Sequence, residues 1–198
     1  PFTVTCDNAE ASRGQARWTS AREWVYDFAA DLPPGAVIGT SSLRRTVLLR
    51  GAAEAGYDFY SNYDSQKGAD LAENPYAELL FYWPELERQV RVSGKVEKIP
   101  EDESAAYYRK RPRDSQIAAH ISTPQSGVID SRETLQRRFQ DLQDQVADKA
   151  VLAKPEFWGG FRLQPDYYEF WQGRPNRLHD RLCYEKAGGV WTLQRLMP

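Results

Sequence analysis

The chain has 198 residues, 41% of them hydrophobic and 27% charged, which is the balance of a globular domain of ordinary size. Lysine and arginine number 26 against 28 aspartates and glutamates, so the net charge of -2 gives no reason to expect a nucleic-acid partner. The two cysteines show no disulfide or metal-ligand spacing, and no apolar run is long enough to span a membrane. These properties predict a soluble cytoplasmic protein without a metal site, a membrane segment or a nucleic-acid partner.

The N-terminal part divides into a weakly patterned arm and the start of a domain. Residues 1–18 show little hydrophobic periodicity, and we expect a single domain to occupy 19–198. A helix is expected from about 22 to 30, because Ser20 and Glu23 have the spacing of a capping box. Strand-like runs follow at 36–40, 46–50 and 57–63.

The middle of the chain alternates between short helices and strands. Ser65 is expected to cap a short helix that ends before Pro75, and 77–83 has the pattern of a buried strand. In the run 88–98, alternate valines are expected to face the core and Arg91 to face solvent.

The second half is expected to hold two longer helices and a final group of strands. Acidic residues begin the run 101–110 and basic residues end it, which matches the helix dipole. Another helix is expected to start near Asp130, where Glu133 completes a capping box, and its core stripe comprises Leu135, Phe139, Leu142 and Val146. Four short strands, GFRLQP, YYEFWQG, RLHDRLCYE and VWTLQRL, then close the chain. The whole pattern predicts an α+β protein that is mainly β, an antiparallel barrel with helices packed outside.

The strand expected at RLHDRLCYE carries an unusual pattern of charge. With a period of two, Arg177, His179 and Arg181 would share one face of this strand. Three neighbouring basic groups repel one another, so one interpretation is that an anion lies in front of them. The alternative is a solvated strand face whose charges contact only water.

No motif for side-chain catalysis or nucleotide binding stands out. The chain lacks GxGxxG, GxxxxGK, GxSxG and HExxH, and it has only two histidines. Basic and hydroxyl groups instead occur beside aromatic residues, as at Arg45, Arg50, Tyr60, Ser61, Lys67, Arg111 and Ser115. Such a set suits the binding of phosphorylated, planar aromatic ligands, with a cofactor that supplies the reactivity.

Five segments carry a resemblance to a known family: FYSNYDSQKG, ERQVRVSGKVE, RPRDSQIAAH, WGGFRLQP and FWQGRPNRLHDR. Together, and in this order over roughly residues 45–198, they resemble the signature segments of the pyridoxine (pyridoxamine) 5'-phosphate oxidase family. The resemblance implies a split-barrel homodimer with FMN at the subunit interface. It also implies oxidation of pyridoxine 5'-phosphate or pyridoxamine 5'-phosphate to pyridoxal 5'-phosphate, with O2 as the electron acceptor and release of H2O2.

The resemblance further assigns roles to individual residues. The implied FMN contacts are Arg45, Thr46, Val47, Leu48, Leu49, Arg50, Tyr60, Ser61, Gln66, Lys67, Gln89, Gln125, Ser126, Trp171 and Arg181. The implied substrate contacts are Arg50, Tyr107, Arg111, Ser115, Arg177, Leu178 and His179, of which Arg177 and His179 are the catalytic candidates. Tyr107 and Arg111 are four positions apart on the expected helix and Ser115 follows shortly, so their donors can converge on one phosphate.

Several positions depart from the family's pattern. Few residues separate Thr40 from Arg45, so the first hairpin is short, and either Arg44 or Arg45 is left as the FMN contact. Gln66 stands where the family usually has arginine, and Arg50 stands where it commonly has lysine. Two alternatives therefore stay open. One is an FMN oxidase of the same fold that acts on another ring system, as in phenazine-pathway relatives, and the other is a non-catalytic binder of flavin or pyridoxal phosphate.

Overall fold

The computed structural model describes residues 2–5, 37–40, 47–53 and 56–198, with side chains from residue 56 onward. The helix expected at 22–30 lies outside these described residues, as do Arg44, Arg45 and Thr46.

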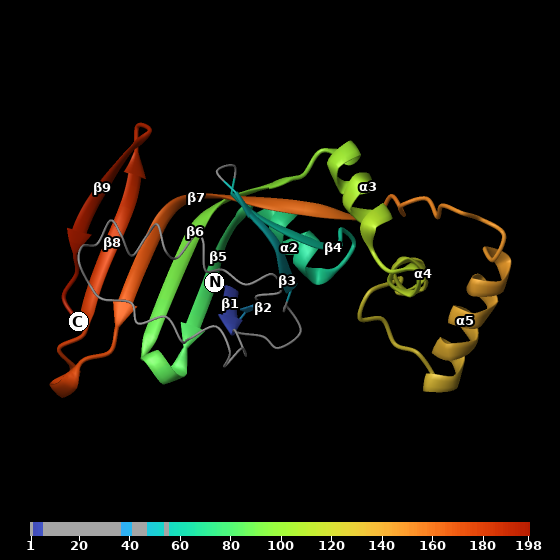
Figure 1. Cartoon of the computed structure of the whole chain (residues 1–198), viewed down its shortest axis with the longest axis horizontal. Helices are drawn as coiled ribbons and strands as arrows, with labels where there is room; N and C mark the ends of the chain where they lie inside the picture. Colours follow the sequence, from blue (N-terminus) through green and yellow to red (C-terminus); the bar gives the residue numbers. More distant parts are fainter. Residues whose placement is uncertain (1, 6–36, 41–46, 54–55) are drawn as a thin grey trace. The chain divides into compact units, whose positions relative to one another are not determined.

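The strands of the described chain join into a nine-stranded sheet (Figure 1). Its order is β1-β2-β3-β4-β7-β6-β5, and β8 pairs with β7 and carries β9 beside it. The strands are β1 (Phe2–Thr5), β2 (Val37–Thr40), β3 (Val47–Ala53), β4 (Gly56–Asn62), β5 (Tyr76–Trp83), β6 (Arg88–Lys98), β7 (Trp158–Gln172), β8 (Asp180–Ala187) and β9 (Val190–Arg195). Pairs such as β3 with β4, β5 with β6 and β7 with β8 are antiparallel. The mainly β, antiparallel architecture predicted from the sequence is confirmed.

The chain divides into two compact units, and each has a core of its own. Unit 1 comprises 1–59, 76–97 and 162–198, and unit 2 comprises 60–75 and 98–161. In unit 1 the core is built by alternation along the strands, and its most buried members are Leu79, Phe81, Val90, Val92 and Leu163. The inward face predicted for the run 88–98 is therefore confirmed.

Strand β7 is longer than the sequence predicted. The segments GFRLQP and YYEFWQG belong to one strand of 15 residues that passes through Pro165. Proline donates no hydrogen bond and usually marks the end or edge of a strand, which is why two strands were expected. At this point Gly94 of β6 lies so close that a Cβ on it would collide with the carbonyl oxygen of Gln164. The backbones of β6 and β7 thus approach closely at the point where β7 passes through the proline.

All the α-helices of the described chain belong to unit 2: α2 (Gln66–Glu73), α3 (Glu101–Lys110), α4 (Arg113–Ile121) and α5 (Arg132–Gln145). Ser65 caps α2 as predicted, and its hydroxyl accepts the backbone N–H of Gly68 at 3.3 Å. Helix α5 is capped by Ser131 rather than by Asp130, because the Ser131 hydroxyl accepts the N–H of Thr134 at 3.1 Å. Helix α4 had no predicted counterpart, because it follows Pro112 directly and no capping side chain marks its start as Ser65 marks that of α2.

The core of unit 2 lies where α4 meets α5. Ile117, Val146 and Leu152 are buried there, and Phe139 and Leu142 pack against them. The stripe predicted for α5 is thus confirmed at Phe139, Leu142 and Val146. Leu135 is 41% exposed, because the packed stripe begins one turn further along the helix. None of the helices in the described part of the chain has the length and apolarity that crossing a bilayer requires.

Candidate functional site

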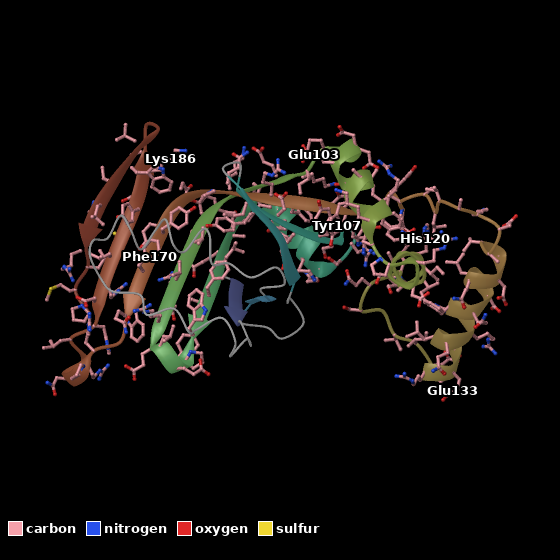
Figure 2. The ribbon with its side chains drawn as sticks, viewed as in Figure 1. Glu103, Tyr107, His120, Glu133, Phe170 and Lys186 are labelled. Atoms are coloured by element: carbon pink, nitrogen blue, oxygen red, sulfur yellow. The ribbon has the colours of Figure 1, made fainter. Side chains whose placement is uncertain are left out.

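Unit 2 contains a stack of aromatic rings that brings two of the candidate residues together. Tyr60 of β4 stacks on Tyr107 of α3, with ring centroids 3.9 Å apart, and on the buried Trp158 of β7 at 5.4 Å. Figure 2 shows Tyr107 on α3. The guanidinium of Arg111 lies 4.7 Å from the centre of the Trp158 ring, a distance typical of a cation–π contact. A predicted FMN contact, Tyr60, and two predicted substrate contacts, Tyr107 and Arg111, thus share one platform.

The junction between α3 and α4 fixes the position of Arg111. This residue ends α3, and its carbonyl oxygen accepts a hydrogen bond from the side-chain amide of Gln116 at 2.9 Å. The hydroxyl of Tyr108 donates to the carbonyl oxygen of Gln116 at 2.8 Å, and burial raises the pKa of Tyr108 to about 12, so it stays a neutral donor. Ser115 lies half-buried in the first turn of α4. The break at Pro112 therefore sets Arg111 and Ser115 at the ends of two helices that are tied to each other.

Lys67 occupies an unusual place in α2. It is only 6% exposed and lies in the first turn, where the helix dipole disfavours a cation and favours an anion beside it. Helix α2 packs closely on Tyr63 at Gly68. A Cβ on Gly68 would collide with the carbonyl oxygen of Tyr63, so only glycine fits this contact. Ser61, at the end of β4, is also buried. Gln66 is exposed, and its amide donates to Asp70 one turn along the helix at 2.8 Å.

Two further predicted FMN contacts of unit 2 lie on its surface. Gln125 and Ser126 are exposed in the loop between α4 and α5, and Ser126 has a left-handed backbone, with φ of 64°. Their side chains are therefore placed by this loop rather than by the core.

In unit 1, the turn between β7 and β8 differs from the predicted strand. Strand β8 begins only at Asp180, and Arg177 belongs to a 3-10 turn, Pro175–Arg177. Asn176 and Arg177 have φ of 59° and 61°, which is incompatible with an extended strand. The prediction that Arg177, His179 and Arg181 share one strand face was therefore wrong.

Ion pairs of Asp180 close this turn. Its carboxylate accepts from Arg174 at 2.8 Å and from Arg195 of β9 at 2.7 Å, and these hydrogen bonds hold the pKa of Asp180 below its ordinary value. Arg177 and Leu178 project into solvent from the turn, and Leu178 is 68% exposed. The turn thus presents two of the predicted substrate contacts.

His179 has a defined orientation within the same turn. Its Nδ1 accepts the backbone N–H of Arg174 at 3.1 Å, and its ring centre lies 4.8 Å from that of Trp171. Because Nδ1 accepts a hydrogen bond, the proton of the neutral imidazole resides on Nε2. His179 can therefore present a hydrogen-bond donor to a ligand.

Arg181 lies opposite Trp171 in the pairing of β7 with β8, and it forms an ion pair with Glu169, which is not among the predicted site residues. Its Nε donates to Oε1 of Glu169 at 2.7 Å, and its Nη1 donates to the carbonyl oxygen of Met197 at 3.0 Å. Glu169 is 3% exposed and also accepts from Arg91 at 3.2 Å. Arg91 lies on the face opposite the buried valines, as expected, with its side chain 36% exposed, but it also pairs with Glu78 and Glu169, which the sequence did not predict.

Glu169 stays ionised in spite of its burial. Burial alone raises its pKa, but the hydrogen bond and charge of Arg181, together with the charge of Arg91, outweigh burial and hold the pKa below its ordinary value. A signal for Glu169 was present in the sequence. It is a lone acid within the aromatic run YYEFW, two residues before Trp171, and it therefore lies on the same face of the strand.

The remaining predicted FMN contacts lie on β3 and β6. Val47 and Leu48 pair with β2, and Leu49 pairs with Phe59 of β4. Arg50 also belongs to β3, but no side chain of this strand is among those described. Gln89 is half-buried in β6 and lies opposite Tyr82 of β5.

The donor set fits a phosphorylated flavin in its chemistry. A buried lysine at the start of a helix suits a phosphate group, and guanidinium and amide donors beside a tryptophan suit the polar edge of a planar ring. Lys67 and Ser61 of unit 2 have the first kind of chemistry, and Gln89, Trp171 and Arg181 of unit 1 have the second.

Comparisons with known proteins agree with this chemistry. Residues 35–145 match the family model described as pyridoxamine 5'-phosphate oxidase. Residues 158–198 match the model described as the pyridoxine 5'-phosphate oxidase C-terminal dimerisation region.

Curated relatives carry the same name. A pyridoxine/pyridoxamine 5'-phosphate oxidase of Acinetobacter baumannii is 82% identical over 154 residues, which are 78% of this chain and 71% of the relative. A protein of that name from Salinibacter ruber is 48% identical over 197 residues, which are 98% of this chain and 91% of the relative.

Two solved structures share the fold. PhzG from Burkholderia lata 383, in complex with tetrahydrophenazine-1-carboxylic acid, has a TM-score of 0.73 at 27% identity and covers 89% of this chain and 90% of its own. A pyridoxamine 5'-phosphate oxidase-related, FMN binding protein from Nostoc punctiforme has a TM-score of 0.58 at 17% identity, covers 78% of this chain and 79% of its own, and supports the fold alone.

These findings define the class first: the chain has the split-barrel fold of FMN-binding proteins, with peripheral helices. Within that class, it belongs to the pyridoxine/pyridoxamine 5'-phosphate oxidase family of oxidoreductases. The fold and the family predicted from the sequence are confirmed.

Replacing Gly68 by alanine tests the placement of Lys67. The added methyl group would collide with the Tyr63 carbonyl and force α2 outward, so we expect Gly68→Ala to lower the melting temperature and to weaken FMN binding. The melting temperature is measured by thermal unfolding, and the affinity for FMN is measured by titration of the flavin-free protein. Ala69→Ser, at an exposed position of the same helix, should change neither. Unaltered FMN affinity in a destabilised Gly68→Ala protein would contradict the role given to Lys67.

Proposed function

We propose that this protein is an FMN-dependent oxidase that converts pyridoxine 5'-phosphate or pyridoxamine 5'-phosphate to pyridoxal 5'-phosphate as a homodimer. The observation that carries the proposal is the identity of 82% to a curated relative of that name, with a second such relative matching 98% of the chain. The match to the family's C-terminal dimerisation region supports the homodimer, with FMN at the subunit interface as the resemblance implies.

The residues of this chain would mainly bind and align the two ligands. When bound, FMN supplies the two-electron acceptor, and O2 then takes the electrons with release of H2O2. Lys67 and Ser61 would hold the phosphate of FMN, while Gln89, Trp171 and Arg181 would contact its ring. The other predicted FMN contacts, Arg45 to Arg50, Tyr60, Gln66, Gln125 and Ser126, complete the proposed set.

The substrate phosphate would be bound from the platform of unit 2. Tyr107 and Arg111 are held against Trp158, and Ser115 lies just beyond the helix break, so the set offers two hydroxyl donors and one guanidinium. Each charge-assisted hydrogen bond to a phosphate dianion contributes about 1.5–3 kcal/mol. Arg177, Leu178 and His179 would contact the substrate ring, and Arg50 would add a further cation.

A second candidate function is favoured by one structural neighbour. PhzG was solved with tetrahydrophenazine-1-carboxylic acid, which has no phosphate, and its fold matches with a TM-score of 0.73. An enzyme of that kind would oxidise an unphosphorylated tricyclic substrate and ignore pyridoxine 5'-phosphate. Its identity of 27% is well below that of the curated oxidases, so we place it second.

A single assay separates these functions. The purified protein is loaded with FMN, and pyridoxal 5'-phosphate and H2O2 are followed after addition of pyridoxine 5'-phosphate in air. We expect both products in equal amounts. Turnover of a dihydrophenazine carboxylic acid alone would favour the second function, and FMN binding without H2O2 from either substrate would indicate a non-catalytic flavin binder.

Arg177→Ala tests the substrate role of the turn. Loss of one charge-assisted hydrogen bond of about 1.5–3 kcal/mol should lower kcat/KM roughly ten- to hundredfold, while the absorbance of bound FMN is retained. Arg138→Ala, at an exposed position of α5, serves as the control and should leave kcat/KM unchanged. Full activity of the Arg177→Ala enzyme would show that Arg177 does not contact the substrate.

The orientation of His179 predicts which substitute works best. Glutamine can place an amide N–H close to the position of Nε2, whereas asparagine reaches only as far as Nδ1. If His179 acts as a donor through Nε2, His179→Gln should retain about tenfold more kcat/KM than His179→Asn, in keeping with one hydrogen bond of about 1.5 kcal/mol. Equal loss in the two variants would instead indicate that protonation of the ring, and not donation by Nε2, is required.

A further inference from the structure

A chain of alternating charges crosses four neighbouring strands of unit 1. Glu78 of β5 binds Arg91 of β6 through two hydrogen bonds, at 3.0 and 2.7 Å. Arg91 continues to Glu169 of β7 at 3.2 Å, and Glu169 binds Arg181 of β8 at 2.7 Å. We call these four residues the charge chain. Its most buried member is Glu169, which is 3% exposed and to which the proposed chemistry gives no role.

The charge chain lies on the strand face that carries predicted FMN contacts. Glu169 and Trp171 are two positions apart on β7 and therefore share a face, and Trp171 lies directly opposite Arg181. Gln89 is likewise two positions before Arg91 on β6. The proposed ring contacts Gln89 and Trp171 thus alternate along their strands with Arg91 and Glu169 of the charge chain, and Arg181 belongs to both sets.

Arg181 is held on several sides. Glu169 binds its Nε, the carbonyl oxygen of Met197 binds its Nη1, and its own carbonyl oxygen accepts the N–H of Leu196 at 2.9 Å. A guanidinium is planar and rigid, so fixing Nε and Nη1 also fixes the direction in which Nη2 points. Among the described residues, Nη2 has no hydrogen-bond partner and can serve a ligand.

The cost of burying Glu169 is offset only while both arginines are present. A buried carboxylate without partners loses several kcal/mol of solvation, and here two guanidinium groups and the hydroxyl of Tyr167, at 3.2 Å, replace the water. Hydrophobic residues of similar size could fill this position without such a cost. The presence of a carboxylate therefore indicates a task that an apolar side chain would not perform.

We propose that Glu169 is a positioning residue for FMN, which it serves by locking the guanidinium of Arg181 in the orientation that donates to the flavin ring. This inference rests on the proposed function, because it requires FMN as the ligand. Glu169 itself does not touch the cofactor. Its effect on FMN binding is transmitted through Arg181.

A double-mutant cycle tests this dependence. FMN affinity is measured by quenching of flavin fluorescence during titration of the flavin-free forms of the wild type, Glu169→Gln, Arg181→Ala and the double variant. We expect Arg181→Ala to raise the Kd for FMN about tenfold or more, from the loss of charge-assisted hydrogen bonding. Glu169→Gln should raise it by several-fold, and the double variant should bind no more weakly than Arg181→Ala alone.

A structural role alone would give a different pattern. In that case Glu169→Gln would weaken binding by the same factor in the presence and absence of Arg181, and such additivity would overturn the proposal. Asp58→Asn is the matched control, because Asp58 also accepts two hydrogen bonds from an arginine, Arg162, at 2.7 and 2.9 Å. This control should lose comparable thermal stability yet keep the wild-type Kd for FMN.

The remaining outcomes are equally decisive. Glutamine keeps the size and an acceptor oxygen, so Glu169→Gln should fold where Glu169→Ala could fail. An unchanged Kd in a folded Glu169→Gln protein overturns the proposal. If the wild type binds FMN but oxidises neither pyridoxine 5'-phosphate nor pyridoxamine 5'-phosphate, the proposed function is overturned, and the double-mutant cycle still tests the role of Glu169. If the wild type does not bind FMN, both the proposed function and the role of Glu169 are overturned.

Discussion

The ion pair between Glu169 and Arg181 is the contact on which the charge chain of unit 1 depends. Both ions are largely withdrawn from water, with exposed side-chain fractions of 3% and 29%. In such surroundings an unpaired charge is costly, so each ion stays only where the other is correctly placed. Arg91 and Glu78 extend this pairing to two more strands. Each ion of the charge chain therefore depends on the placement of its neighbour, and the four side chains are fixed relative to one another.

The two units orient these arginines through different contacts. Arg181 is held by the opposite charge of Glu169, whose carboxylate accepts from its Nε at 2.7 Å. The guanidinium of Arg111 lies 4.7 Å from the centre of the Trp158 ring, and this cation–π contact orients it. In both cases a neighbour that lies far away in the sequence sets the direction of a guanidinium.

Local patterns in the sequence predicted the elements well, whereas long-range pairings could not be read from it. The alternation of valines predicted the buried face of β6. The acidic residues at the start of α3 and the basic residues at its end predicted that helix. Nothing in the sequence around Arg91 showed that its partner, Glu169, would come from 78 positions away. Strand register decides such a pair, and register is set by packing over the entire sheet.

The turn before β8 shows how a correct pattern can give a wrong structure. Arg177, His179 and Arg181 do recur with a period of two, but the positive φ angles of Asn176 and Arg177 turn the chain away from a strand. Arg174 and Arg195 converge on Asp180 and stabilise that turn, a pairing that requires β9 to lie beside β8. The period of two in the sequence therefore does not correspond to a shared strand face. A turn can direct Arg177 and His179 independently, which a strand, with its fixed alternation, cannot do.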